Sequence, residues 1–478
     1  MKLNKKKYNA IPKTVKASIW YTICNILQKG ISFLVIPIYT RLLTTEEYGN
    51  YTVFQSWRDI IIIFATLNLY CGVFTKAMVD YENDRDRYTS SMQGLSTVIT
   101  VLFLGIYLVN RPFWNKVLGM NTITMLLLFV YYIVYPAFSF WSVRQRVEYK
   151  YIKMVIVTLF VSFITPVISL ILLYCTDLRE NAVIGGYLIV QILIGFIIYL
   201  YNFKKDKTFF NKGYWLYALR FNIPLIPHYL SLIVLGQADR IMISNICGSG
   251  EAAIYSLAYQ VSMLMNIIIN AINSAFVPWI YEKLKEKNYE KIKETSKYIG
   301  TLIAVMSVGV ILIAPEIIKI LGTEEYLSAI WIIPAVATSI YFTYCYGLFS
   351  NVEFYFGSTN YVMIASSIGA ILNIVLNAIF IPLFGFIAAG YTTLVCYLFF
   401  MLAHYYFMKR ICDKKLEGAK IFDTKFIIYS CVILCGVSAG CMILYNGYII
   451  RYLLMLSILL IIVSFRKKIL QILHSLKG

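Results

Sequence analysis

Residues 14–62 read TVKASIWYTICNILQKGISFLVIPIYTRLLTTEEYGNYTVFQSWRDIII. This stretch contains two long apolar segments joined by a short polar turn, and each segment is long enough to cross a bilayer as a helix. The first segment carries Lys29 near its middle, and the second carries Arg58 and Asp59 about as deep. Because a charged residue at mid-membrane costs roughly 2.5–3.5 kcal/mol on insertion scales, we expect these side chains to face water or a partner.

The composition extends this interpretation to the whole chain. Hydrophobic residues make up 60% of the 478 residues and charged residues 14%, whereas soluble domains carry about 25% charged residues. The recurring apolar runs predict an all-α polytopic membrane protein with about 14 transmembrane helices. We place these helices at 15–40, 50–78, 91–110, 120–142, 153–174, 183–203, 217–244, 253–280, 297–314, 328–349, 361–382, 387–408, 425–445 and 449–465.

Short matches between the two halves predict an internal repeat. The pattern Glu-x-x-x-Tyr occurs at 47–51 and again at 251–255, and Lys-(Val/Ile)-Leu-Gly occurs at 116–119 and 319–322, at nearly the same offset. We therefore expect two six-helix lobes, related by a parallel repeat around a central cleft, plus two extra helices. The predicted parts are residues 1–210, 211–410 and 411–478.

The positive charge of the chain follows the predicted topology. Most of the 43 Lys and Arg residues lie in segments that become cytoplasmic if the N-terminus is inside, which is the asymmetry of inner-membrane proteins. We therefore predict a multi-pass protein with both termini in the cytoplasm. Orientation and contact with anionic headgroups account for the net charge of +19, so we expect membrane lipids, and no nucleic acid, as partners.

Local signals predict helix starts and one break. Thr44 and Glu47 have the spacing of a capping box at the start of the second span. Thr323 and the glutamates after it predict a second capping box before residues 328–349. Two prolines at 224 and 227 predict a bend in the span at 217–244.

Polar residues recur at helical spacing within several spans and so share one face of each helix. Such faces either join helices by hydrogen bonds or line a binding site. The candidates for substrate binding are Lys29, Arg58, Asn25, Gln28, Arg240, Asn266, Asn270, Asn273, Asn373 and Asn377. The candidates for ion coupling are Asp59, Asp239 and His228.

The charges of the first two spans favour an anionic ligand. Arg58 and Asp59 are sequence neighbours, which do not face each other on a helix, whereas Asp59 could pair with Lys29 across helices. One carboxylate for two cations leaves an excess positive charge. Enzymes are not indicated, because the sequence has no G-x-x-x-x-G-K-[ST], H-E-x-x-H or G-x-S-x-G motif and no paired carboxylates in a long outside loop. We expect no catalytic residues, no metal site and no cofactor other than a coupling ion, H⁺ or Na⁺.

Two regions resemble a known family. The pattern Gln28-Lys29-Gly30, then Ile-Pro at 36–37 and RLLTTEEYGNY at 41–51, resembles the first two spans of Wzx-type polysaccharide flippases. Residues 223–258, with IPLIP, ADRIMIS and IYSLA, resemble spans 7 and 8 of the same proteins, which belong to the multidrug/oligosaccharidyl-lipid/polysaccharide (MOP) exporter superfamily.

This resemblance implies a function. The family's lobes form a V and translocate an undecaprenyl-pyrophosphate-linked oligosaccharide, for O-antigen, capsule or a similar surface polysaccharide, across the bacterial cytoplasmic membrane by alternating access. Polysaccharide polymerase machinery is an expected partner. In the related lipid II flippases, cationic residues of the first two spans hold the pyrophosphate, and Lys29 and Arg58 are placed comparably. A lipid II-type flippase and a drug or cation antiporter of the same superfamily are the alternatives.

Overall fold

A computed structural model describes residues 12–464, apart from the side chains at 359, 459 and 461–464. Described residues 12–43 and 50–233 form one compact unit (unit 1), and residues 44–49 and 234–464 form a second (unit 2). Unit 1 contains α2 (Lys13–Leu42), most of α3 (Thr45–Thr66), α4 (Val73–Asp80), η1 (Glu82–Asp84), α5 (Arg85–Val109), α6 (Arg111–Leu118), α7 (Thr122–Val147), α8 (Tyr151–Cys175), α9 (Glu180–Lys205), α10 (Lys212–Asn222), η2 (Ile223–Leu225) and the start of α11 (Ile226–Ile246). Unit 2 contains the rest of α11, α12 (Ser249–Lys285), α13 (Tyr289–Leu312), α14 (Ala314–Leu321), η3 (Glu324–Trp331), α15 (Ile333–Tyr355), α16 (Thr359–Phe384), α17 (Ala388–Lys415), α18 (Thr424–Ile443), η4 (Leu444–Asn446) and α19 (Tyr448–Ser464).

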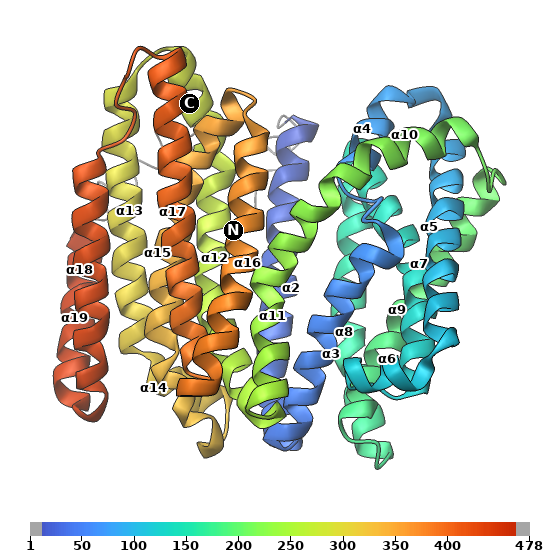
Figure 1. The fold of residues 1–478 in the computed structure, drawn as a ribbon, viewed down its shortest axis with the longest axis horizontal. Helices are drawn as coiled ribbons and strands as arrows, with labels where there is room; N and C mark the ends of the chain where they lie inside the picture. The colour runs from blue at the N-terminus through green and yellow to red at the C-terminus, as the bar shows by residue number, and fades with distance from the viewer. Residues whose placement is uncertain (1–11, 465–478) are drawn as a thin grey trace, which may run out of the picture. The chain divides into compact units, whose positions relative to one another are not determined.

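The predicted all-helical membrane fold is confirmed (Figure 1). Each of the fourteen predicted ranges contains a helix, and eleven helices of the described chain are long and apolar enough to cross a membrane. If η3 and α15, which are bent by 47° relative to each other, are counted as one span, the number is twelve. The second predicted span, 50–78, is two helices, because α3 ends at Thr66 and α4 begins at Val73 after a turn that contains positive-φ residues.

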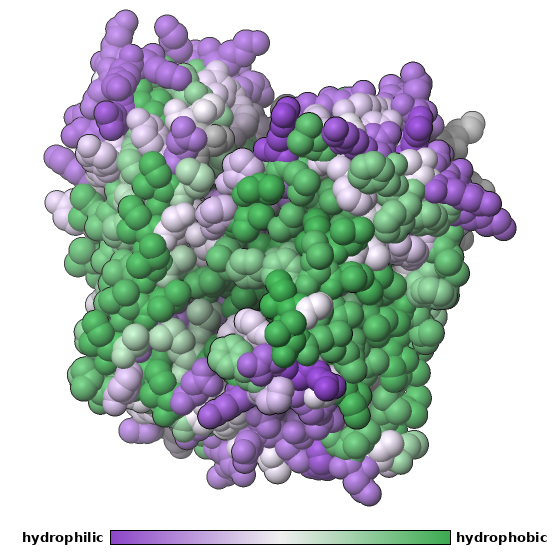
Figure 2. Space-filling model, turned by 45° about the vertical axis from the view of Figure 1, so that its right-hand side comes forward, coloured by the Kyte–Doolittle hydropathy of each residue, from purple (hydrophilic) through white to green (hydrophobic). Residues whose placement is uncertain are grey.

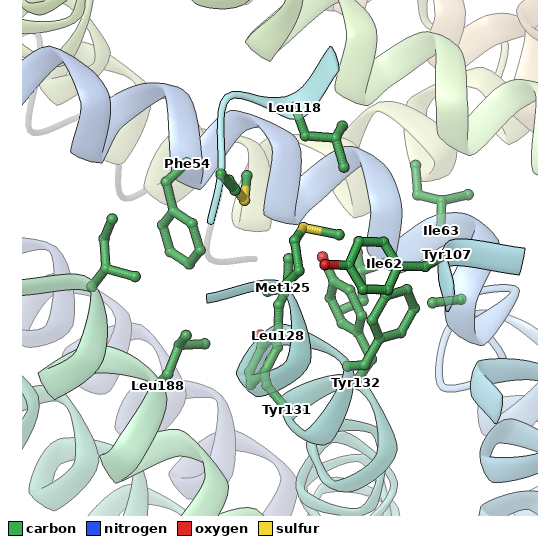
Figure 3. Close-up of a cluster of buried hydrophobic side chains, with 14 residues drawn as sticks. Phe54, Ile62, Ile63, Tyr107, Leu118, Met125, Leu128, Tyr131, Tyr132 and Leu188 are labelled. Atoms are coloured by element: carbon green, nitrogen blue, oxygen red, sulfur yellow. The ribbon is translucent and has the colours of Figure 1, made fainter. Parts of the chain in front are cut away.

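One cluster of buried side chains in unit 1 joins α3 to α7. Phe54, Ile62 and Ile63 of α3 lie among Met125 and Leu128 of α7, all of them buried (Figure 3). Phe54 and Ile62 are eight residues apart, about two turns, and so point to similar sides of α3, whereas Ile63 lies further round the helix. Arg58 and Asp59 follow Phe54 by about one turn and lie beside this cluster, where the Tyr132 hydroxyl of α7 donates to the carbonyl of Arg58 at 2.8 Å.

The predicted bend at the two prolines is confirmed. Helix α10 ends at Asn222, the short 3₁₀ segment η2 contains Pro224, and α11 starts at Ile226. Helix α10 lies across α4 and α5 (Figure 1), held by a hydrogen bond from Trp215 Nε1 to the carbonyl of Ser91 at 3.0 Å.

Helix α15 is the centre of unit 2. It packs against α12, α13, α17 and α18, and most of its side chains are buried. Because α15 is apolar on all sides except for a few residues, any charged group that it holds must be satisfied inside the unit.

The first turn of α3 belongs to unit 2. Glu47 accepts a hydrogen bond from the backbone N–H of Thr44 at 2.8 Å, and the Thr44 hydroxyl accepts one from the N–H of Glu47 at 3.2 Å, so this capping box is confirmed. The second predicted capping box is wrong. Thr323 makes no side-chain cap, because a 3₁₀ helix rather than an α-helix starts there.

The unit boundary differs from the predicted lobe boundary. It falls inside α11, after residue 233 rather than after residue 210, and the described part of 411–478 is a portion of unit 2. The matched sequence patterns occupy matched places. Both α6 and α14 are eight-residue helices that end at the leucine before the matching glycine.

The exposed surface is typical of a membrane protein. On the face drawn in Figure 2, hydrophobic side chains occupy the middle of the surface and hydrophilic ones gather at its upper and lower ends. Phe160 and Phe163 of α8 and Val432 and Ile433 of α18 are examples of large apolar side chains that are more than half exposed, as expected where lipid is the solvent.

Candidate functional site

In unit 1, Arg58 of α3 contacts its own neighbour. Its Nη2 lies 2.7 Å from Oδ1 of Asp59, and its Nε donates to the same oxygen at 2.9 Å. The expectation that these two residues do not pair is wrong, because the long guanidinium arm turns back to the adjacent carboxylate. The guanidinium also lies over the ring of Tyr187 on α9, 4.8 Å from its centroid.

Lys29 has a different environment. It is exposed on α2, and none of the ion pairs that the structure describes includes it, so the alternative pairing with Asp59 is not found. Asn25 is exposed one turn away. Gln28 faces α8, where its Nε2 donates to the hydroxyl of Ser162 at 3.0 Å, so this candidate joins two helices of unit 1.

In unit 2, Asp239 of α11 is the most enclosed candidate, with 1% of its surface exposed. Its Oδ2 accepts hydrogen bonds from the hydroxyls of Tyr255 on α12 and Thr393 on α17, the latter at 2.9 Å. Its Oδ1 accepts from Nδ2 of Asn377 on α16 at 2.6 Å. Within residues 12–464 no ion pair includes Asp239, so four helices converge on a carboxylate whose partners are all neutral.

A second layer of amides and hydroxyls surrounds this carboxylate. Oδ1 of Asn377 accepts from the hydroxyl of Thr392, and Nδ2 of Asn377 lies 3.4 Å from Oδ1 of Asn373. Asn373 and Asn377 are fully buried, and Nδ2 of Asn373 has no hydrogen-bond partner in the described part of the chain. We call Asp239, Tyr255, Asn373, Asn377, Thr392 and Thr393 the Asp239 cluster.

Arg240 points away from its acidic neighbour. Its Nε donates to the Ser256 hydroxyl at 3.1 Å, its Nη1 donates to the carbonyl of Gly236 at 2.7 Å, and its guanidinium lies 4.8 Å from the centroid of the Tyr259 ring. With 8% exposure, Arg240 is a structural cation of unit 2 in this arrangement, available to a ligand only if these bonds break.

The remaining candidates form no described contact with the Arg58–Asp59 pair or with the Asp239 cluster. Asn266 of α12 is half-buried and donates to Met263 of the same helix, Asn273 is half-buried, and Asn270 is exposed. His228 is half-buried at the start of α11 in unit 1, with its ring beside Tyr229.

Sequence reasoning missed several residues that complete these environments. Thr392, Thr393 and Tyr187 had no signal beyond being polar or aromatic residues within a span. Tyr255 had one, because it belongs to the repeated Glu-x-x-x-Tyr pattern.

The apolar spanning helices are those of a polytopic membrane protein, and two family models place the chain among the transporters of the MOP superfamily. The chain belongs to the polysaccharide biosynthesis protein family, whose model matches residues 14–284. The MatE model matches residues 224–379.

Curated relatives agree with this family. The chain is 23% identical to "Lsg locus putative protein 1" of Haemophilus influenzae, over 75% of this chain and 89% of the relative. It is 22% identical to "Capsular polysaccharide biosynthesis protein CapF" of Staphylococcus aureus, over 83% of this chain and 100% of the relative.

Solved structures share the fold. The lipid II flippase MurJ in an inward closed conformation matches with a TM-score of 0.65 at 16% identity, over 95% of this chain and 100% of that one. An inward-facing multidrug resistance MATE family transporter of the MOP superfamily matches with a TM-score of 0.62 at 15% identity, over 81% and 96%.

Proposed function

We propose that this protein translocates an undecaprenyl-pyrophosphate-linked oligosaccharide across the bacterial cytoplasmic membrane by alternating access. The observation that carries the proposal is Lys29, an exposed cation in the middle of a spanning helix that forms none of the described ion pairs. A charge in such a position is retained where it binds a substrate, and a pyrophosphate supplies the missing anion. Membership of the polysaccharide biosynthesis family supports the oligosaccharide.

Arg58 is the second phosphate ligand in this proposal. Its guanidinium is held by the Tyr187 ring and by Asp59, so its position is set before substrate arrives. A guanidinium binds phosphate oxygens in a bidentate manner, and Asp59 then competes with the phosphate for the same donors. Such competition allows release, because the carboxylate replaces the leaving anion.

The exposed amides of the polar faces bind the sugars in this scheme. Asn25 and Asn270, which are exposed, remain available for that role, and so does the half-buried Asn273. Asn373 and Asn377 do not, because both are buried beside Asp239, and we assign them to ion binding instead.

The Asp239 cluster is the proposed ion-coupling site. A buried carboxylate that no cation neutralises is costly, so binding H⁺ or a hard cation such as Na⁺, for which carboxylate, amide and hydroxyl oxygens are suitable ligands, stabilises the closed cluster. Because the cluster joins α11, α12, α16 and α17, loss of the ion favours separation of these helices.

The test is a cell-surface polysaccharide assay in cells that lack the chromosomal gene. Lys29→Ala and Arg58→Ala should each abolish or strongly reduce surface polymer at normal membrane levels of the protein. The matched control is Lys116→Ala, which removes an exposed cation at the end of α6. Unchanged polymer in both site variants would remove the assignment.

Two alternatives predict other readouts. A lipid II-type flippase would rescue cells depleted of their own lipid II flippase, and a drug or cation antiporter would change dye efflux and leave surface polymer unaltered. The fold is compatible with either, since both kinds of transporter share it.

A further inference from the structure

A buried acid and a buried histidine meet at the C-terminal half of unit 2. Glu353 lies near the end of α15 and His404 lies on α17, and their side chains are 0% and 2% exposed. Oε1 of Glu353 lies 2.9 Å from Nδ1 of His404, which is hydrogen-bond distance. No role in the proposed transport uses this pair.

The other oxygen of the same carboxyl has nothing to bond. Oε2 of Glu353 is buried without a hydrogen-bond partner in the described part of the chain. An ionised carboxylate beside a neutral imidazole would therefore be a buried net charge with one oxygen unsatisfied, which is strongly unfavourable. One added proton makes the pair neutral overall, whether the proton resides on Glu353 Oε1 or on His404 Nδ1. Unlike a metal ion, a proton needs no cavity between the two side chains.

The walls around the pair are aromatic. The His404 ring stacks on Tyr346 of α15, with centroids 5.4 Å apart, and on Phe400 of α17, at 6.2 Å. Among the described residues, His404 is the only titratable group that forms a hydrogen bond or an ion pair with the Glu353 carboxyl.

Titratable groups on the helices packed against α15 and α17 have other partners. Lys297 of α13 pairs with Asp423, and Lys415 of α17 donates to the carbonyl of Phe356. Three further examples are Tyr281 of α12, which lies against Tyr355, Tyr361 of α16, which stacks on Phe407, and Cys431 of α18, which lies against Met401. None of them supplies a counter-charge to the pair.

We propose that Glu353 and His404 form a proton-binding site in unit 2, in which the folded chain holds one proton between Glu353 Oε1 and His404 Nδ1. The proton comes from bulk water, and no other bond forms or breaks. It leaves when α15 and α17 separate enough for water to solvate the carboxylate.

The site shares a helix face with the Asp239 cluster. His404 follows Thr393 by eleven residues, which is about three turns and about 16 Å along α17, and Tyr397 and Phe400 lie between them on that face. A shift of α17 therefore acts on both groups. The proton site itself does not depend on the proposed substrate, because its test measures protons and not transport.

The test compares the pH dependence of unfolding of the purified full-length chain in detergent between pH 7 and 9. Above the ordinary pKa of histidine, about 6.5, the unfolded pair holds no proton, whereas the folded pair holds one. The folding equilibrium constant should therefore fall about tenfold per pH unit more steeply in the unsubstituted chain than in Glu353→Gln. Glu290→Gln, which removes an exposed carboxylate on α13, should have the slope of the unsubstituted chain. Equal slopes in Glu353→Gln and the unsubstituted chain would overturn the proposal.

A second measurement leaves Glu353 in place. The chain has three histidines, so nitrogen NMR of histidine-labelled protein resolves their rings, and the His404 signal is the one lost in His404→Gln. We expect this signal to stay constant from pH 5.5 to 8.5. A His404 ring that titrates near about 6.5, as an exposed histidine does, would overturn the site even if Glu353→Gln failed to fold.

Discussion

The hydroxyl of Thr393 on α17 donates to Oδ2 of Asp239 on α11 at 2.9 Å. Two helices that are 154 residues apart at this contact thus meet on one buried carboxylate. Neutral donors reduce the cost of burying that charge but do not cancel it. The coupling role proposed for Asp239 rests on the cost that remains, because binding a cation would remove it.

Asp239→Asn is expected to leave the fold intact and to remove ion dependence. The hydroxyls of Tyr255 and Thr393 can turn to accept from the new amide, so we expect a thermal midpoint within a few degrees of the unsubstituted chain. Transport in vesicles should fall to background at every H⁺ or Na⁺ gradient. Asp177→Asn, at an exposed position before α9, is the control. Ion-dependent transport by Asp239→Asn would assign coupling to another group.

Substitutions in the Arg58–Asp59 pair distinguish a role in substrate binding from a purely structural role. Arg58→Lys loses the bidentate fork and the contact with Tyr187, and we expect substrate affinity to fall by about 10- to 100-fold, the equivalent of one charge-assisted hydrogen bond of about 1.5–3 kcal/mol. Asp59→Asn removes the competitor, so substrate affinity should be equal or higher.

Binding of the lipid-linked substrate to purified variants measures both effects. If the pair only holds α3 in place, the two variants should instead lose thermal stability to the same degree and bind equally, and Arg58 would not be a substrate ligand.

Two glycines on α5 test the packing of unit 1. A Cβ at Gly94 would lie 2.0 Å from the carbonyl oxygen of Phe209, whereas a Cβ at Gly105 would meet nothing within 4 Å. Gly94→Ala should therefore destabilise the protein by about 1–3 kcal/mol or more, and Gly105→Ala should be neutral or stabilising by up to about 1 kcal/mol. Thermal unfolding in detergent gives both values, and a Gly94→Ala chain as stable as Gly105→Ala would show that the two segments are not in close contact.

The start of α18 predicts a pH dependence. The Lys297 ammonium lies 2.5 Å from Asp423 and lowers the pKa of that carboxyl, with help from the backbone N–H of Phe426. Because the folded pKa lies below the unfolded one, the pair stabilises the fold above about pH 4 and this stabilisation is lost as the pH falls further. Both side chains are about a third exposed or more, so the contribution is about 0.2–1 kcal/mol.

Asp423→Asn isolates this contribution. Asparagine keeps the N-cap that Asp423 makes to Phe426 and removes the charge. The variant should be less stable at pH 7 and should lose less stability than the unsubstituted chain between pH 6 and 3. Parallel thermal midpoints over that range would mean that the ion pair does not form.

The fold could be predicted from the sequence because lipid and water leave few choices. An apolar run of about 20 residues has to be a helix in a bilayer, and the capping signal at Thr44 and the prolines of α11 act within one turn of the chain. Thr323 shows the limit of such signals. Its spacing fits a capping box, yet the chain forms a 3₁₀ segment there.

The site could be predicted only in part. The sequence marks Asp239 and Asn377 as polar residues in apolar runs, but not that they contact each other, because 138 residues separate them. It also suggests that neighbours such as Arg58 and Asp59 do not meet, and here side-chain length overrides the helical spacing rule. Contacts between distant helices depend on packing that no local pattern encodes.

Translocation by the purified protein is the most direct test of the central claim. The chain is reconstituted into vesicles with an undecaprenyl-pyrophosphate-linked oligosaccharide, and the fraction of oligosaccharide reached by a membrane-impermeant glycosidase is followed over time. We predict that the accessible fraction rises beyond the outer-leaflet value with the unsubstituted chain, and that Lys29→Ala abolishes this rise while Lys116→Ala retains it. An accessible fraction that stays at the outer-leaflet value with the unsubstituted, folded chain would contradict the account.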